Sequence, residues 1–274
     1  MRLGITLPNR QADGRSPTIA QLIERLGFDG IWMGDSVSRV EWPVPDVLAW
    51  LTAAAAGTQS IELGTAILQV PLRHPVELAQ RLMSLHGLSE GRFTAGLGSG
   101  STRADFDAVG VPYEDRFKLL SAALPTIKQI LRGDRVGAAH LTPWSNARGG
   151  PKILVGSWHS GRWLDLAATE YDGWIASGFF TNFNQLTEGI NHFRAKGGKR
   201  AMVGTITVNL HAPYTPFDPE SRFHLECPPE EAAARLRRLA DLGYDDALLA
   251  RANYSETDLP EDDLAQIRAL VPRA

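Results

Sequence analysis

The sequence has very little cysteine and no long apolar run. Its 274 residues contain one cysteine, Cys227, which excludes an internal disulfide framework and a zinc site built from cysteines. The longest apolar stretch, around residues 47–57, is far shorter than the roughly 18 residues of a membrane span. Residues 1–15 lack the apolar core of a signal peptide. We therefore expect a soluble, cytoplasmic protein with no membrane partner.

The sequence also lacks an excess of charge of either sign. The 28 Lys and Arg residues stand against 31 Asp and Glu, so the net charge is −3. A nucleic-acid-binding domain is expected to be basic, and we therefore expect no nucleic-acid partner. Hydrophobic residues make up 43% and charged residues 22%, which is typical of a globular chain. No His and acidic residues have the spacing of metal ligands, so we expect no metal.

Short apolar segments alternate with longer amphipathic segments along the whole chain. The predicted strands are residues 2–7, 30–33, 61–66, 92–97, 152–155, 173–176, 201–210 and 246–250. The predicted helices are residues 17–26, 45–58, 74–88, 113–132, 162–169, 182–196, 229–242 and 261–270. Eight strand–helix units predict an α/β fold, a (β/α)8 TIM barrel, as a single domain over residues 1–274. A doubly wound open sheet is the alternative.

The densest motifs lie between Leu63 and Gly100. Leu-Gly-Thr closes the third predicted strand, Arg-His-Pro precedes the third helix, and Gly-Arg-Phe leads into Gly-x-Gly in the fourth strand. This segment resembles the bacterial luciferase-like family of flavin- and deazaflavin-dependent oxidoreductases, and flanking matches extend the resemblance over residues 1–180. The resemblance implies a TIM barrel that binds FMN or the deazaflavin F420 at the carboxyl ends of its strands.

The resemblance also implies an activity. The leading interpretation is an FMN-dependent monooxygenase, in which reduced FMN reacts with O2 to form a C4a-peroxyflavin that oxygenates a small organic substrate. A separate flavin reductase and a homo-oligomer, commonly a dimer, are expected as in relatives. One alternative is hydride transfer by F420, whose acidic tail favours a basic groove; Arg39, Arg73, Arg103 and Arg162 are the candidates. A non-catalytic flavin-binding protein is the alternative from another class.

Two segments are implied to lie beside the cofactor ring. In the family, a bulge with a non-prolyl cis peptide after the third strand supports the ring, which here involves Thr65, Ala66 and Ile67. The loop containing Gly98 and Ser99 is also expected beside the flavin. Bacterial luciferase has a reactive cysteine and a phosphate-contacting arginine there, so this chain departs from that pattern.

The cofactor phosphate is expected at the start of the helix that begins near residue 162. Exposed N–H groups at a helix start bind phosphate, and Ser and Arg side chains add charge-assisted hydrogen bonds. The resemblance points to this region as well. Capping of the helix by a serine side chain is the structural alternative. The candidate residues are Ser157, His159, Ser160, Gly161 and Arg162.

The loop after the second predicted strand contains the candidate catalytic residues Asp35, Ser36 and Glu41. Many family members have Asp-His here, and Ser36 stands at the position of that histidine. A hydroxyl is a poor general acid near neutral pH without help. The serine therefore weakens the expectation that this chain uses the family's usual histidine-dependent mechanism. Trp42 and Trp158 are candidates for the walls of a substrate cleft, with core packing as the alternative.

Overall fold

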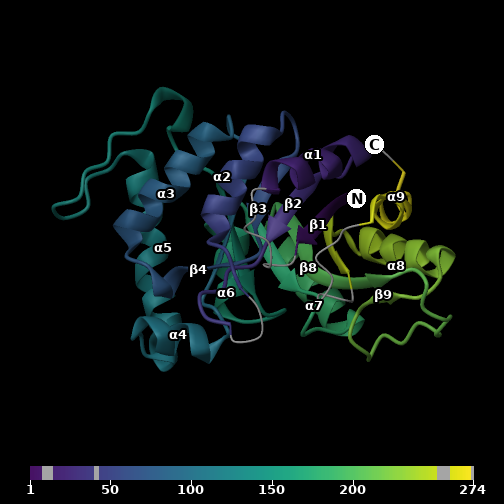
Figure 1. The fold of residues 1–274 in the computed structure, drawn as a ribbon. Helices are drawn as coiled ribbons and strands as arrows, with labels where there is room; N and C mark the ends of the chain where they lie inside the picture. The colour runs from purple at the N-terminus through teal and green to yellow at the C-terminus, as the bar shows by residue number, and fades with distance from the viewer. Residues whose placement is uncertain (8–14, 40–42, 252–259, 273–274) are drawn as a thin grey trace. The chain divides into compact units, whose positions relative to one another are not determined.

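The computed structural model describes residues 1–7, 15–39, 43–251 and 260–272 (Figure 1). Strands and helices alternate along the chain, as expected. The strands are β1 Arg2–Leu7, β2 Gly30–Met33, β3 Glu62–Thr65, β4 Leu68–Gln69, β5 Phe93–Gly98, β6 Lys152–Ser157, β7 Gly173–Ser177, β8 Arg200–Asn209, β9 Leu225–Glu226 and β10 Asp246–Arg251. The helices are α1 Ser16–Leu26, α2 Val47–Gly57, α3 Pro75–Leu88, α4 Arg103–Val109, α5 Arg116–Arg132, α6 Arg162–Thr169, α7 Phe183–Ala195, α8 Pro229–Leu242 and α9 Glu261–Arg268.

The strand order confirms the predicted (β/α)8 barrel over an open sheet. Neighbouring strands follow the order β10-β1-β2-β3-β5-β6-β7-β8-β9, and β10 also pairs with β8, which closes the sheet. Strands β2 and β5 are buried along their whole length. This pattern is typical of a parallel sheet covered on both faces, and it explains why these strands read as continuous apolar runs.

The chain divides into two compact units. The first contains Met1–Pro8, Gln21–Trp32 and Leu154–Ala274. The second contains Asn9–Ala20 and Met33–Ile153. The expectation of one domain over residues 1–274 stays a prediction.

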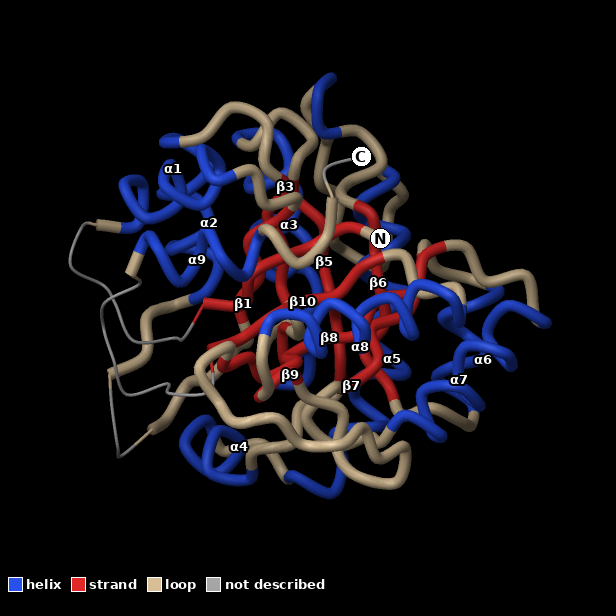
Figure 2. The backbone as a smooth tube through the Cα atoms, turned by 90° about the vertical axis from the view of Figure 1, so that its right-hand side faces the viewer, coloured by secondary structure: helices blue, strands red, loops and turns tan. Residues whose placement is uncertain are grey.

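In the first unit, β8 is the central strand, since it pairs with β7 and β10, and β10 continues to β1. Helices α6 and α7 lie side by side on the outside of this sheet (Figure 2). His192 of α7 contacts Asp165 of α6 with an Nε2–Oδ1 distance of 2.5 Å. A Cβ on Gly4 would lie 2.7 Å from Trp32 and Leu248, so the tight packing of β1 requires glycine there.

In the second unit, Arg92 of the Gly-Arg-Phe motif ties the start of β5 to the end of α2. Its Nη1 donates to Thr58 Oγ1 at 2.8 Å, and its Nη2 donates to the carbonyl of Ala55 at 2.9 Å. These carbonyl and hydroxyl groups belong to a helix end, where acceptors lack helical partners. The motif arginine therefore has a structural role.

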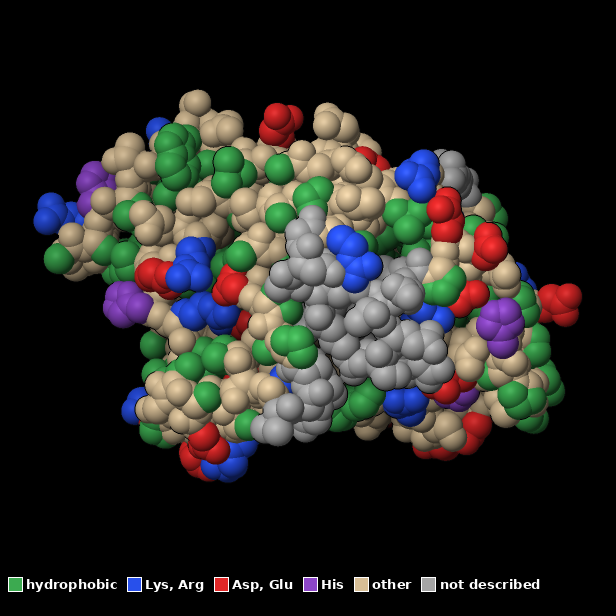
Figure 3. Space-filling model, viewed as in Figure 1, with side chains coloured by type: hydrophobic (Ala, Val, Ile, Leu, Met, Phe, Trp, Pro, Cys, Tyr) green, Lys and Arg blue, Asp and Glu red, His purple; other side chains and the backbone are tan. Residues whose placement is uncertain are grey.

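The sequence prediction of a helix over residues 113–132 was wrong at its start. Residues Tyr113–Asp115 form a 3₁₀ turn, and α5 begins at Arg116. Helix α4 was not predicted, because its seven residues are too short to show a helical period. On the face drawn in Figure 3, acidic and basic side chains are interspersed, in keeping with the balanced composition.

Candidate functional site

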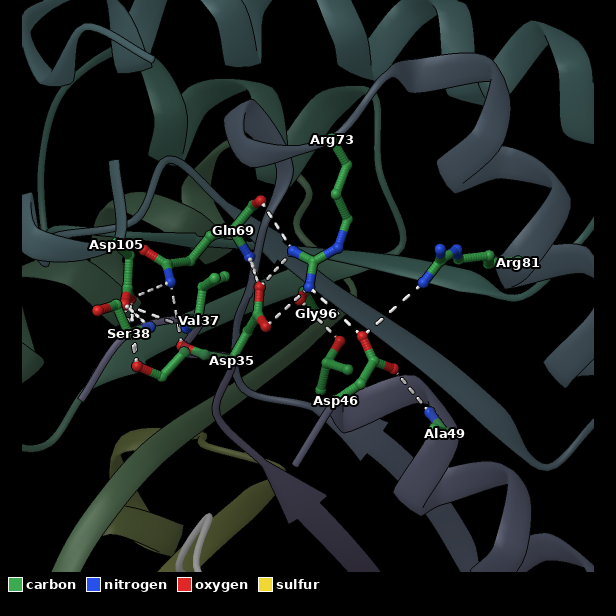
Figure 4. Close-up of polar contacts among 12 residues, drawn as sticks. Asp35, Val37, Ser38, Asp46, Ala49, Gln69, Arg73, Arg81, Gly96 and Asp105 are labelled. Carbon is green, nitrogen blue, oxygen red and sulfur yellow. Dashed lines mark hydrogen bonds and ion pairs between the residues drawn. The ribbon is translucent and has the colours of Figure 1, made fainter. Parts of the chain in front are cut away.

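A buried ion pair lies at the centre of the polar contacts in the second unit (Figure 4). Asp35 follows β2, and Arg73 precedes α3. Arg73 Nη1 donates to Asp35 Oδ2 at 2.5 Å and Nη2 donates to Oδ1 at 3.0 Å. The Arg73 side chain is only 12% exposed and the Asp35 side chain only 1%. Burial alone lowers the pKa of Arg73, but the hydrogen bond and charge of Asp35 outweigh it and raise that pKa above its usual value.

The ion pair is joined to the first turn of α2. Asp46 Oδ1 accepts a hydrogen bond from the backbone N–H of Ala49 and so caps that helix. Its Oδ2 lies 3.9 Å from Arg73 Nη2 and 3.8 Å from Arg81 Nη1. Arg73 therefore faces two carboxylates, and the bidentate one is the buried one.

Gln69 links Asp35 to the end of β4. Its backbone N–H donates to Asp35 Oδ2 at 3.0 Å, and its Nε2 donates to the Asp35 carbonyl at 3.2 Å and to Asp105 Oδ2 at 2.7 Å. Gln69 is 3% exposed, and its Oε1 is buried with no hydrogen-bond partner among the described residues. A Cβ on Gly100 would lie 2.3 Å from this Oε1.

Asp105 on α4 is fully buried and holds the loop after β2. Ser36 Oγ donates to both of its carboxylate oxygens at 3.2 Å. The backbone N–H groups of Val37 and Ser38 donate to Oδ1 at 3.1 and 2.8 Å. The Ser36 hydroxyl is therefore committed to Asp105, and Ser36 itself is 8% exposed.

The same unit contains the segment that was expected to support a cofactor ring. The Ala66–Ile67 peptide is cis, as expected from the resemblance. The N–H of Ala66 donates to the Met33 carbonyl at 2.8 Å, and the N–H of Asp35 donates to the Ile67 carbonyl at 3.1 Å. The end of β2 and the loop after it are thus bonded directly to the residues on the two sides of this peptide.

The other ring candidates lie at the neighbouring strand ends. Thr65 is fully buried, and its hydroxyl donates to the Gly96 carbonyl at 2.8 Å. Gly98 pairs with Gln69 at the end of β5. Ser99 Oγ lies 3.4 Å from the Gly100 carbonyl. The Thr65 hydroxyl is therefore already engaged in a hydrogen bond within the protein, whereas Gly98 offers only its backbone to a ligand.

We expect Gly100→Ala to lower the free energy of unfolding by about 2–3 kcal/mol, since the new Cβ meets Gln69 in a backbone with φ of +78°. Gly110→Ala is the matched control, because Gly110 has φ of +71° but open space around it. We expect about 1 kcal/mol for the control. Urea unfolding measures the free energy of both variants. Equal losses of stability would show that the position of Gln69 does not require a glycine at residue 100.

The candidate phosphate loop lies in the first unit, between β6 and α6. Helix α6 begins at Arg162, and its N-cap is Gly161 with φ of 88° and no side-chain capping hydrogen bond. Capping by Ser160 is thus not what the structure shows. A Cβ at Gly161 would meet nothing within 4 Å, so the approach to the helix start is open. Ser160, Gly161 and Arg162 are all exposed.

His159 lies against α7. A Cβ on Gly189 would lie 3.0 Å from His159 Cβ, and His159 Nε2 is 3.9 Å from Glu188 Oε2. Its Nδ1 is buried without a partner among the described residues. Ser157 Oγ donates to the Trp158 carbonyl at 3.1 Å. The histidine therefore packs against α7, while Ser160 of the same loop is exposed.

Sequence reasoning missed the roles of Gln69 and Asp105 and did not predict the pairing of Arg73 with Asp35. Arg73 carried a signal, since it belongs to the Arg-His-Pro motif. Asp105 carried none, because its helix was not predicted. Glu41 and Trp42 lie outside the described residues.

No described helix is long and apolar enough to cross a membrane. No group of three or more His, Cys, Asp or Glu side chains within the described ranges has the arrangement of a metal site.

Comparison with known proteins identifies the family. The chain is 32% identical over 171 residues to limonene 1,2-monooxygenase of Rhodococcus erythropolis, covering 55% of this chain and 44% of that protein. It is 33% identical over 144 residues to F420-dependent glucose-6-phosphate dehydrogenase of Kineococcus radiotolerans, covering 50% and 42%. The chain thus spans less than half the length of these curated relatives.

A solved structure shares the fold. The oxygenating constituent of 3,6-diketocamphane monooxygenase from Pseudomonas putida, a type II Baeyer-Villiger monooxygenase in complex with FMN, superposes with a TM-score of 0.75 at 16% identity. The alignment covers 98% of this chain and 96% of that one. The family model for luciferase-like monooxygenases matches residues 1–213. The chain therefore belongs to the luciferase-like monooxygenase family.

Proposed function

We propose that this protein is a flavin-dependent oxidoreductase of the monooxygenase type, which uses FMN and O2 to oxidise a small organic substrate. The family match over residues 1–213 carries the proposal. The likeness to limonene 1,2-monooxygenase supports the monooxygenase form. When bound, reduced FMN supplies the electrons that activate O2.

Hydride transfer with F420 is the second candidate, supported by the likeness to F420-dependent glucose-6-phosphate dehydrogenase. The acidic tail of F420 requires a basic groove. Arg73 is already bound to Asp35, and Arg103 pairs with Glu114 at 2.7 Å. Arg39 donates to Thr102 Oγ1 at 3.1 Å. Because two of the four candidate arginines already have carboxylate partners, FMN is the better fit.

The start of α6 fits the phosphate of FMN. Backbone N–H groups at a helix start attract an anion, and a helix without a side-chain cap leaves that position open. Gly161 is such an N-cap, and it has open space on its side-chain side. We propose that Ser157, Ser160 and the backbone of Gly161 and Arg162 bind the phosphate. His159 contributes to this phosphate site by packing on α7, which holds the loop in place.

The residues around the Ala66–Ile67 peptide fit the cofactor ring. Gly98 offers only backbone at the end of β5, and Gln69 packs against Gly100, where a Cβ would lie 2.3 Å from its Oε1. We propose that the backbone of Thr65, Ala66 and Ile67, with Gly98 and Ser99, supports the ring. The buried Oε1 of Gln69 lacks a donor among the described residues, which is consistent with a polar group that belongs beside it in the complete site.

We propose that Asp35 and Ser36 act by positioning. The Asp35 carboxylate is held by Arg73, and the Ser36 hydroxyl donates to Asp105. Neither group is free to exchange a proton with a substrate in this arrangement. Glu41 stays the predicted acid or base of this loop.

The wider setting of the enzyme is also a proposal. A separate flavin reductase would supply reduced FMN, and the protein would act in the cytoplasm as a homo-oligomer. The alanine-rich helix α2 supports close approach of another helix, which is consistent with a dimer. A non-catalytic flavin-binding protein is the outcome if bound flavin never changes redox state with any substrate.

A charge substitution tests the phosphate site. We expect Ser160→Asp to weaken FMN binding at least tenfold, because the carboxylate repels the phosphate at the start of α6. Riboflavin, which lacks the phosphate, should bind the variant and the wild type equally. Quenching of flavin fluorescence measures both affinities.

Thr169→Asp is the matched control, since it adds the same charge at the exposed far end of the same helix. We expect its FMN affinity to stay within twofold of the wild type. Unchanged FMN binding in Ser160→Asp would place the phosphate elsewhere. A parallel loss of riboflavin binding would indicate general damage to the site.

A further inference from the structure

Three large aromatic side chains are exposed together in the first unit. Trp158 follows β6, and Phe179 and Phe180 follow β7. They are 56%, 43% and 56% exposed. The ring centroids of Trp158 and Phe180 are 6.0 Å apart, and those of Phe179 and Phe180 are 4.9 Å apart. We call these three residues the aromatic cluster. Their exposure excludes core packing as the role of Trp158.

Hydrogen bonds hold the turn that carries Phe179 and Phe180. Gly178 N–H donates to the Gly204 carbonyl at 2.6 Å, and Phe180 N–H donates to Ser177 Oγ at 3.3 Å. Phe223 N–H donates to the Thr181 carbonyl at 3.2 Å. The rings of Phe179 and Phe180 thus stand on a fixed turn, so a ligand that binds them need not order this turn first.

The charge around the aromatic cluster favours a neutral ligand. Arg222 lies with its guanidinium carbon 5.2 Å from the Phe179 ring centroid. Its Nη2 donates to Glu226 Oε1 at 3.1 Å, which balances the charge. Exposed aromatic faces stack on other rings through offset or edge-to-face contacts. The cluster therefore suits a planar, uncharged ring.

The size of the aromatic cluster favours a small molecule over a protein. Three side chains of this kind, each about half exposed, present roughly 300 Å². A stable protein interface needs about 800 Å² from each partner. Contiguous exposed apolar groups on a soluble protein commonly mark a binding site, and binding sites of (β/α)8 barrels lie at the carboxyl ends of the strands.

We propose that the aromatic cluster binds the organic substrate, and that this substrate carries a neutral, planar ring. The identification of the ligand as substrate rests on the proposed function. The ring of the substrate stacks on Trp158 and Phe180, while Phe179 closes one side. This contact selects the substrate and leaves the redox chemistry to the cofactor.

Fluorine NMR tests the proposal on the whole protein without cofactor. The chain has seven tryptophans, and Trp158→Phe assigns the Trp158 signal in protein labelled with 5-fluorotryptophan. Indole is the neutral planar probe, and indole-3-acetate is its charged counterpart. We expect indole to shift the Trp158 signal in a saturable way and to bind at least as tightly as indole-3-acetate. No shift, or tighter binding of the charged probe, would overturn the proposal.

Phe180→Ala should weaken indole binding about fivefold, because one stacking partner is lost. Phe117→Ala, at a phenylalanine on α5 that is 41% exposed, should leave it unchanged. FMN affinity should be the same in both variants. A loss of FMN binding in Phe180→Ala would assign the cluster to the cofactor, and a Trp158 shift with protein concentration alone would assign it to self-association. If indole binds but neither FMN nor F420 does, the proposed function fails while the ring site stands.

Discussion

Arg73→Met is expected to lower the free energy of unfolding by about 3–5 kcal/mol, because it leaves the Asp35 carboxylate buried without its partner. The Asp35 side chain is only 1% exposed, so water cannot replace the lost guanidinium. Methionine keeps most of the apolar volume of the arginine, which separates the loss of charge from a loss of packing. Urea unfolding followed by circular dichroism measures the change.

Arg81→Met is the matched control for this prediction. Arg81 pairs with Glu77 one turn away, and both side chains are more than 40% exposed. Exposed pairs at this spacing contribute about 0.3–0.5 kcal/mol. The double variant Asp35→Asn with Arg73→Met should recover part of the stability, since no buried charge is then unpaired. A similar small loss in Arg73→Met and Arg81→Met would contradict the central place of the ion pair.

Asp105→Asn is expected to cost about 2–4 kcal/mol, because hydrogen bonds to a buried charged group contribute more than neutral ones. Four donors converge on this carboxylate: the Ser36 hydroxyl, the N–H groups of Val37 and Ser38, and Gln69 Nε2. The asparagine amide turns one acceptor into a donor, so at least one of the four donors loses its partner. The same urea experiment measures the loss.

Asp107→Asn makes the same change two residues along α4, at an exposed position. We expect a change within about 0.5 kcal/mol for this control. Flavin affinity of Asp105→Asn, measured at a denaturant concentration where it is fully folded, should also fall, since the loop after β2 is bonded to the Ala66–Ile67 segment. Stability equal to that of Asp107→Asn would mean that Asp105 does not hold this loop.

The local patterns of the sequence predicted the barrel well. Strands such as β2 and β5 are buried on both faces, so each reads as an apolar run between breakers. The Arg-His-Pro and Gly-Arg-Phe motifs led to the family, and the cis Ala66–Ile67 peptide was expected from it.

The partners within the site were beyond sequence reasoning. Asp35 and Arg73 are 38 residues apart, and Ser36 and Asp105 are 69 apart. Hydrophobic periodicity reports which face of an element is buried, but it does not report which polar groups meet across the fold. Asp35 was therefore predicted as a catalytic candidate without its arginine partner, and its role in catalysis stays a prediction. Likewise, Ser160 was weighed as an N-cap, and Gly161 takes that position because its φ of 88° suits glycine.

Equilibrium dialysis of the wild-type protein against FMN and, separately, F420 tests whether this chain binds the cofactor of a flavin-dependent monooxygenase. We expect saturable binding of FMN at one molecule per chain and weaker binding of F420. Binding of F420 alone would replace the monooxygenase with hydride transfer. Binding of neither cofactor would contradict the claim that this chain is a flavin-dependent oxidoreductase.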